Sequence, residues 1–145
     1  MAGYPETHLD ATSAEDDIKY LKEKVDAGAD LVITQLFYDN SLFLKFVENC
    51  KEIGIEVPII PGIMPIQSYG GFQRMTTLCK THVPEHIMTE LEEFKDDDAA
   101  VKQYGVDHCV KMCQELIDND IKYLHFYTLN PVSYTHLTLP TNREV

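Results

Sequence analysis

The chain has 145 residues, of which 44% are hydrophobic and 25% are charged, and its formal net charge is −12. These values are ordinary for one globular domain with a substantial core. The acidic balance argues against nucleic acid or an anionic membrane as a partner. No apolar run approaches the roughly 20 residues of a membrane span and no signal peptide opens the chain, so we expect a cytoplasmic protein.

The first predicted elements are the end of a strand, a loop and an amphipathic helix. Ala2-Gly3-Tyr4 predicts the end of a strand, because Pro5 restricts the residue before it to extended geometry. Thr12-Ser13-Ala14-Glu15 fits a capping box, with a hydroxyl at the N-cap and a carboxylate three residues later. Apolar residues at helical spacing follow, and Gly28 predicts the end of this helix.

The next stretch, Gly28 to Phe37, contains the helix end and the strand whose pattern the rest of the chain repeats. Five or six residues with strand character end at Gln35, before the turn-prone pair Asp39-Asn40. In α/β proteins the carboxyl ends of parallel strands are where ligands bind. The side chain of Gln35 offers an amide donor and a carbonyl acceptor, so this residue is a candidate for ligand binding.

The remaining elements repeat this alternation of helix and strand. We predict a helix that begins at Asp39 or Asn40 and ends at Gly54, and a strand over 57–63 that is buried on both faces. The later predicted elements are a helix over 68–80, a short helix with Pro84 in its first turn, a long helix that begins near Asp96-Asp97-Asp98 and reaches Ile117, and a strand over 123–127.

Helices that alternate with short apolar strands indicate an α/β protein with parallel β/α units. One truncated and three complete strands fit about half of an eight-stranded barrel or a small doubly wound sheet, and periodicity alone leaves both open. No Gly-x-Gly-x-x-Gly or Walker-type loop follows a strand, which weakens the nucleotide-binding doubly wound alternative.

The segment 131–145 lacks the helical pattern that a β/α unit requires. It resembles a tail that recurs on translated transcript fragments, and we predict that it is non-native and foreign to the fold.

The four cysteines form no Cys-x-x-Cys pair. Cys109 and Cys113 lie four residues apart in a helical pattern and could hold two ligand positions of a metal ion. Cysteines in a reducing compartment more often act as small buried or half-buried hydrophobic residues, and we expect this of all four. We therefore predict free thiols and no metal site.

Several ordered motifs resemble methylenetetrahydrofolate reductase, and together they cover about residues 2–130. The motifs are Ala2-Gly3-Tyr4-Pro5-Glu6-x-His8, Asp17 with Lys24, Ala27-Gly28-Ala29-Asp30, Ile33-Thr34-Gln35-Leu36-Phe37, Ile60-Pro61-Gly62-Ile63-Met64-Pro65-Ile66 and Leu124-His125-Phe126-Tyr127-Thr128-Leu129-Asn130. The resemblance implies a (β/α)8 TIM barrel, of which residues 1–130 would be a C-terminal part of about four β/α units.

The family that the chain resembles consists of flavoenzymes. FAD takes a hydride from NADH or NADPH and passes it to 5,10-methylenetetrahydrofolate, which becomes 5-methyltetrahydrofolate. Gln35 matches the position that contacts the folate, and Tyr127 matches a position near the substrate. Four residues match family positions that contact FAD: Tyr4, His8, Asp17 and Lys24. The resemblance also implies a folate as the small-molecule partner and a homo-oligomer for the full-length protein.

The chain departs from the family pattern at several places. The family's glutamate general acid lies on an earlier strand, Pro131 stands where an arginine helps to bind folate, and Leu9-Asp10 stands where Pro-Glu is frequent. We therefore expect this chain alone to be inactive. The alternative functions are a non-catalytic barrel or interaction piece and a different barrel enzyme with a phosphate site. The absence of a Gly-rich phosphate loop late in the chain counts against the last.

Residue types alone leave structural roles open beside the functional ones. Asp17 and Lys24 also fit a solvated helix face, and Tyr127 also fits a plug at the end of a barrel. Glu6 lies two residues before His8, and a structural role in the loop is its favoured interpretation.

Overall fold

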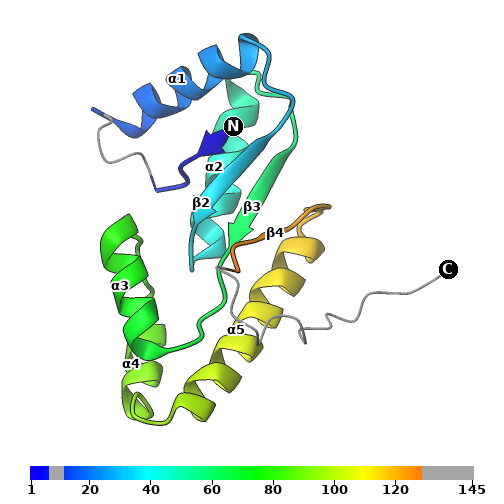
Figure 1. The fold of residues 1–145 in the computed structure, drawn as a ribbon. Helices are drawn as coiled ribbons and strands as arrows, with labels where there is room; N and C mark the ends of the chain where they lie inside the picture. The colour runs from blue at the N-terminus through cyan, green and yellow to red at the C-terminus, as the bar shows by residue number, and fades with distance from the viewer. Residues whose placement is uncertain (7–11, 129–145) are drawn as a thin grey trace, which may run out of the picture.

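The computed structural model describes residues 1–6 and 12–128, so the predictions on His8 and on the tail 131–145 lie outside the described residues. Helices and strands alternate along the described chain, as predicted (Figure 1). In chain order the elements are β1 (Ala2–Gly3), α1 (Ala14–Asp26), β2 (Val32–Leu36), α2 (Asn40–Glu52), β3 (Ile59–Ile63), α3 (Tyr69–Cys79), α4 (Glu85–Glu93), α5 (Asp98–Asp118) and β4 (His125–Phe126).

The four strands form one parallel sheet with the order β1-β2-β3-β4. The register pairs Ala2 with Ile33, Val32 with Ile59 and Gly62 with His125. The structure thus confirms an α/β fold with a parallel sheet. Among the described residues the strand order follows the chain order without a reversal, whereas doubly wound sheets reverse at a switch point.

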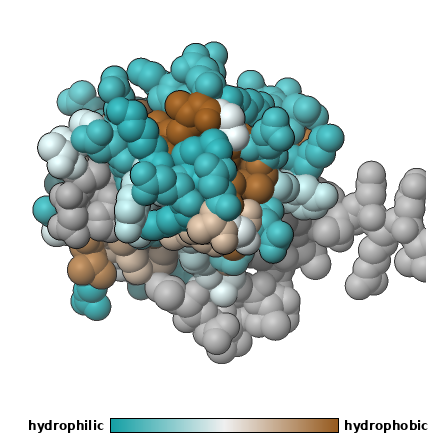
Figure 2. All heavy atoms as spheres, turned by 90° about the horizontal axis from the view of Figure 1, so that it is seen from above, coloured by the Kyte–Doolittle hydropathy of each residue, from teal (hydrophilic) through white to brown (hydrophobic). Residues whose placement is uncertain are grey.

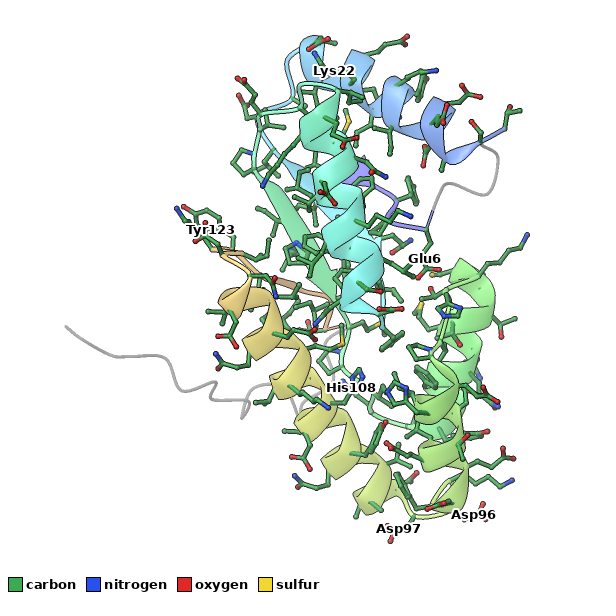
Figure 3. All side chains as sticks on the ribbon, turned by 180° about the vertical axis from the view of Figure 1, so that it is seen from behind. Glu6, Lys22, Asp96, Asp97, His108 and Tyr123 are labelled. Atoms are coloured by element: carbon green, nitrogen blue, oxygen red, sulfur yellow. The ribbon has the colours of Figure 1, made fainter. Side chains whose placement is uncertain are left out.

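Helix α2 covers one face of the sheet in both the front and the rear view (Figures 1 and 3). The core beneath it includes Val32 and Ile63 from the strands and Phe43 from α2, each at most 2% exposed. A second cluster of buried side chains lies beyond the carboxyl ends of the strands. It joins the end of β2 to α3, α4 and α5 through Leu36, Tyr38, Ile66, Phe72, Ile87, Leu91 and Val101.

Helix boundaries agree with the sequence prediction to within a few residues, with two corrections. The N-cap of α1 is Ser13 and not Thr12, and its hydroxyl accepts a hydrogen bond from the backbone N–H of Asp16. Pro84 occupies the N-cap position of α4 and not its first turn. Asp39 and Asp97 cap α2 and α5 through their carboxylates, which satisfies backbone donors that have no partner within a helix.

Two strands, β3 and β4, are shorter than predicted. The predicted strand 57–63 pairs only from Ile59, and the predicted strand 123–127 pairs only at His125–Phe126. β4 has β3 as its only partner among the described strands, and the register pairs just His125 and Phe126 of it. Tyr123, labelled in Figure 3, is 63% exposed and precedes the paired residues.

The four cysteines are buried or half-buried, as predicted. Cys50, Cys109 and Cys113 are at most 8% exposed, and burial raises the pKa of the Cys50 thiol to about 11. No group of three or more metal-ligating side chains gathers within residues 1–6 and 12–128.

The surface at the end where α1 finishes is mainly hydrophilic, with small hydrophobic islands (Figure 2). Leu31, at 36% exposed, and Ile53, at 38%, contribute apolar surface to the loops between helices and strands. None of the helices in the described part of the chain is both long enough and apolar enough to span a membrane.

Candidate functional site

A cavity of about 550 Å³ lies between β1, the loop after it, and α1. Three residues that were singled out as cofactor contacts line this cavity together: Tyr4, Asp17 and Lys24. The cavity is also lined by Met1, Ala2, Gly3, Thr12, Asp16, Tyr20, Leu21 and Phe46. The fold therefore brings one residue that follows β1 to two residues that lie seven positions apart on α1.

The position of α1 follows from its own sequence. Leu21 is 6% exposed and packs in a cluster with Val32 and Phe46, which holds the helix against β2 and α2. Asp17 and Lys24 lie four residues before and three after Leu21, so all three share one side of the helix. The burial of Leu21 thereby turns the two charged side chains toward the cavity.

The cavity carries both signs of charge and one aromatic contact. The Lys24 ammonium lies 4.3 Å from the centre of the Tyr20 ring, which is the geometry of a cation–π contact. At the first turn, Asp16 lies 3.9 Å from Lys19, and both side chains are largely exposed. An ammonium, a carboxylate and hydroxyl groups around one cavity suit a ligand that has both phosphate and hydroxyl groups.

Gln35 lies near the carboxyl end of β2, and Tyr127 directly follows β4. The Tyr127 hydroxyl donates a hydrogen bond to the backbone carbonyl of Thr34, 2.9 Å away, so it contacts the residue next to Gln35. The Gln35 side-chain carbonyl accepts a hydrogen bond from the backbone N–H of Leu36 at 3.0 Å. The acceptor of Gln35 is therefore engaged within the chain, and its amide N–H groups are the part that remains to donate to a ligand.

The two regions lie close to each other. Burial raises the pKa of Tyr127, and the nearby phenol of Tyr4 raises it further. The Tyr127 hydroxyl is thus held in its protonated, donating form near neutral pH. Tyr4 connects the cavity beside β1 to the strand ends that carry Gln35 and Tyr127.

The sequence model of methylenetetrahydrofolate reductase matches residues 1–139 of the chain. The chain belongs to the methylenetetrahydrofolate reductase family. The match continues past residue 130, where the sequence predicts the start of a non-native tail, and that boundary stays a prediction.

Curated members of the family resemble the chain over most of its length. "Methylenetetrahydrofolate reductase (NADH) 1" of Zea mays is 52% identical over 139 residues, an alignment that covers 90% of this chain and 23% of the maize protein. "Probable methylenetetrahydrofolate reductase (NADPH)" of Caenorhabditis elegans is 50% identical over 130 residues, with 89% of this chain and 20% of that protein covered. The chain thus spans about a quarter or less of the length of these relatives.

A bacterial relative and a solved structure extend the comparison. The "5,10-methylenetetrahydrofolate reductase" of Pectobacterium carotovorum is 38% identical over 130 residues, which cover 90% of this chain and 44% of that protein. The fold resembles, with a TM-score of 0.56 and 17% identity, a structure titled "Uncharacterized protein from Clostridium thermocellum binds two copies of 5-methyl-5,6,7,8-tetrahydrofolic acid". That resemblance covers 89% of this chain and 46% of the other, and it supports the fold.

Motif spacing missed the roles of two residues of the site, Thr34 and Gly62, whereas Glu6 was predicted to have a structural role in the loop. Glu6 accepts a hydrogen bond from the backbone N–H of His82 at 2.6 Å, and Figure 3 shows it between β1 and α3. This tie confirms the structural interpretation of Glu6. Burial, the largest effect, raises the pKa of its carboxyl, and the bond from His82 partly offsets that rise.

Thr34 and Gly62 belong to a local irregularity of the sheet. Ile33 pairs with Ile60 and Leu36 pairs with Gly62, so β2 has one more residue than β3 between the two pairs. This is a β-bulge, and bulges are frequent beside functional sites, where they redirect a side chain. The sequence offered one signal for it, because Gly62 within a strand often marks a bulge or a close backbone approach.

Proposed function

We propose that the chain is part of a flavin-dependent methylenetetrahydrofolate reductase, in which it supplies residues for FAD and for the folate. The observation that carries this proposal is the convergence of Tyr4, Asp17 and Lys24 on one cavity, next to the strand ends that hold Gln35 and Tyr127. Family membership and the names of the relatives support the reaction and the use of NADH or NADPH as the reductant.

The donor set of the cavity fits FAD. Its volume of about 550 Å³ lies within the range of small-molecule sites. The Lys24 ammonium is suited to a phosphate oxygen, and the Asp17 carboxylate is suited to accept hydrogen bonds from ribose hydroxyls. Tyr4 and Tyr20 add aromatic surface on the wall of the cavity.

FAD would supply the hydride chemistry, and the protein would bind, orient and shield the reactants. Within this chain, Gln35 would donate a hydrogen bond from its amide to the pterin or to the nicotinamide amide in turn. This use of one side chain suits a site that two substrates occupy alternately. The general acid would come from a strand that precedes this segment in the complete enzyme.

The architecture supports a place in the carboxyl-terminal part of a (β/α)8 barrel. Four parallel strands follow chain order, and β1 and β4 each have one strand neighbour among the described residues. A barrel needs further strands to pair with these two edges. We therefore propose that activity requires the barrel strands that the longer relatives possess and that the isolated chain has no turnover.

The test is a chimera in which residues 1–128 replace the aligned segment of the maize reductase. The proposal predicts a yellow protein that retains FAD through gel filtration and oxidises NADH with 5,10-methylenetetrahydrofolate as acceptor. The matched control is the same chimera with Asp17→Asn and Lys24→Met, which should fold alike and retain less flavin. A folded wild-type chimera without flavin would contradict the proposal and would favour a non-catalytic barrel piece.

A further inference from the structure

At the β-bulge in β2, three side chains make hydrogen bonds to backbone groups of β2 and β3. The hydroxyl of Thr34 accepts a hydrogen bond from the backbone N–H of Gly62 at 3.0 Å, and the carbonyl of Thr34 accepts one from the Tyr127 hydroxyl at 2.9 Å. The third bond joins the side-chain carbonyl of Gln35 to the backbone N–H of Leu36 at 3.0 Å.

These three bonds surround Gln35. Gln35 lies between Thr34, which receives two of the bonds, and Leu36, which donates the third. Thr34 is completely buried, so water does not compete for its hydroxyl or its carbonyl. In a regular ladder a backbone carbonyl would accept the bond from Gly62, and here the bulge replaces it with a side chain.

Gly62 makes the contact with Tyr127 possible. A Cβ atom at this position would lie 2.3 Å from the carbonyl oxygen of Thr34 and 2.5 Å from Cε2 of Tyr127. Only a residue without a side chain allows the tyrosine ring to cross β3 and reach the carbonyl on β2. The ring therefore spans three strands, from β4 over β3 to β2.

We infer that Tyr127 and Thr34 are positioning residues that act on the ligand through Gln35. They fix the bulge, and the bulge fixes the direction in which the Gln35 amide presents its N–H donors. The ligand group that Gln35 recognises is then a hydrogen-bond acceptor, such as a carbonyl oxygen or ring nitrogen. This inference rests on the proposed function, since it takes the ligand to be the folate, and it assigns Tyr127 a role other than direct contact with the substrate.

The test is a double-mutant cycle on the flavin-loaded chimera, read as the dissociation constant of 5-methyltetrahydrofolate. Tyr127→Phe removes the bond to Thr34 and should weaken folate binding about tenfold, the loss of one hydrogen bond. In a Gln35→Met background the same change should have less than about a twofold effect, because the residue through which it acts is absent. Flavin retention should be unchanged in all variants.

The conservative pair at Thr34 separates positioning from general damage to the fold. Thr34→Ser keeps the hydroxyl and should bind folate within about twofold of the wild-type chimera, whereas Thr34→Val should weaken binding about as much as Tyr127→Phe. If Thr34→Val does not fold, Tyr127→Phe and Thr34→Ser still carry the test.

Two outcomes would overturn the inference in different ways. Equal losses from Tyr127→Phe with and without Gln35 would show that Tyr127 acts independently of it, and the proposed function would stand. A wild-type chimera that holds flavin but does not bind 5-methyltetrahydrofolate would overturn the proposed function together with the inference.

Discussion

The cavity beside β1 and the bulge in β2 are two neighbouring regions built on different physical principles. The cavity takes its charged groups from one face of α1, where Lys24 is exposed and Asp17 half-buried. The bulge relies on hydrogen bonds around Thr34, which is completely buried. An exposed charge adds little to the stability of a fold, whereas an unsatisfied buried donor is costly.

Because of this difference, we expect mutations in the two regions to have different effects on binding and stability. In the cavity, we expect binding and stability to be separable, because the apolar side chain of Leu21 packs α1 against β2 and α2. At the bulge they are coupled, because the bonds that orient Gln35 also complete the pairing of β2 with β3. The comparison leads to four predictions, which all use the chimera.

The largest expected effect comes from Gly62→Ala. The new Cβ would lie within 2.5 Å of the Thr34 carbonyl and the Tyr127 ring, so a strand or the ring must move. We expect a loss of about 3 kcal/mol in the free energy of unfolding, measured from the urea midpoint. Gly70→Ala is the matched control, since nothing lies within 4 Å of its Cβ position, and it should change stability by less than about 0.5 kcal/mol. Equal losses of stability in Gly62→Ala and Gly70→Ala would contradict the close packing assigned to Gly62.

Thr34→Val should have the second largest effect. The change preserves shape but leaves the buried backbone N–H of Gly62 without its acceptor. The expected loss is about 2 kcal/mol in urea unfolding. Thr34→Ser keeps the acceptor and should lose about 1 kcal/mol from the missing methyl group. A serine variant less stable than the valine variant would show that packing, and not the hydrogen bond, governs this position.

Lys24→Met should change binding and leave stability nearly untouched. The side chain is exposed, so the free energy of unfolding should change by less than about 0.5 kcal/mol. The flavin dissociation constant should rise about tenfold or more, because a charge-assisted bond to phosphate is lost. Lys45→Met on α2 removes the same charge from an exposed position that does not line the cavity, and it should leave flavin affinity unchanged. Equal flavin affinities in Lys24→Met and Lys45→Met would show that Lys24 does not contribute to flavin binding.

The smallest effect concerns the pH dependence that Glu6 contributes. Its pKa in the folded state is raised above 4.5, mainly by burial, so folding favours the protonated carboxyl. The stabilisation from Glu6 is therefore fully present below pH 4.5 and decreases as the pH rises through the raised pKa. Glu6→Gln should remove this decrease, which urea midpoints at a series of pH values would reveal. Parallel profiles for the two proteins would contradict the assignment.

The order of the elements could be predicted from the sequence because it depends on local patterns, whereas Asp17 and Lys24 were implied as cofactor contacts by the resemblance to methylenetetrahydrofolate reductase. The spacing of Asp17, Leu21 and Lys24 already predicts that they share one side of a helix. The same reasoning missed the N-cap of α1, because Thr12 and Ser13 are adjacent hydroxyl residues, each with a carboxylate three positions later. Spacing cannot choose between two such registers.

The bulge could not be predicted in the same way, because it depends on contacts distant in the chain. Threonine has a high strand propensity, so its presence in a buried strand does not by itself indicate a bulge. Its partner Tyr127 lies 93 positions away, so no local pattern relates the two. Apart from Gly62, the mostly apolar strand β3 carries no sequence signal of a register shift of one residue against β2.

The division of the site into a cofactor cavity and a strand end is tested most directly by one pair of titrations on three proteins: the wild-type chimera, Lys24→Met and Tyr127→Phe. Flavin affinity is measured first, and 5-methyltetrahydrofolate affinity is then measured at saturating flavin. We expect Lys24→Met to weaken flavin binding alone and Tyr127→Phe to weaken folate binding alone. If each variant weakened the binding of both ligands equally, or of neither, this would contradict the division of the site into a cofactor cavity and a strand end that orients Gln35.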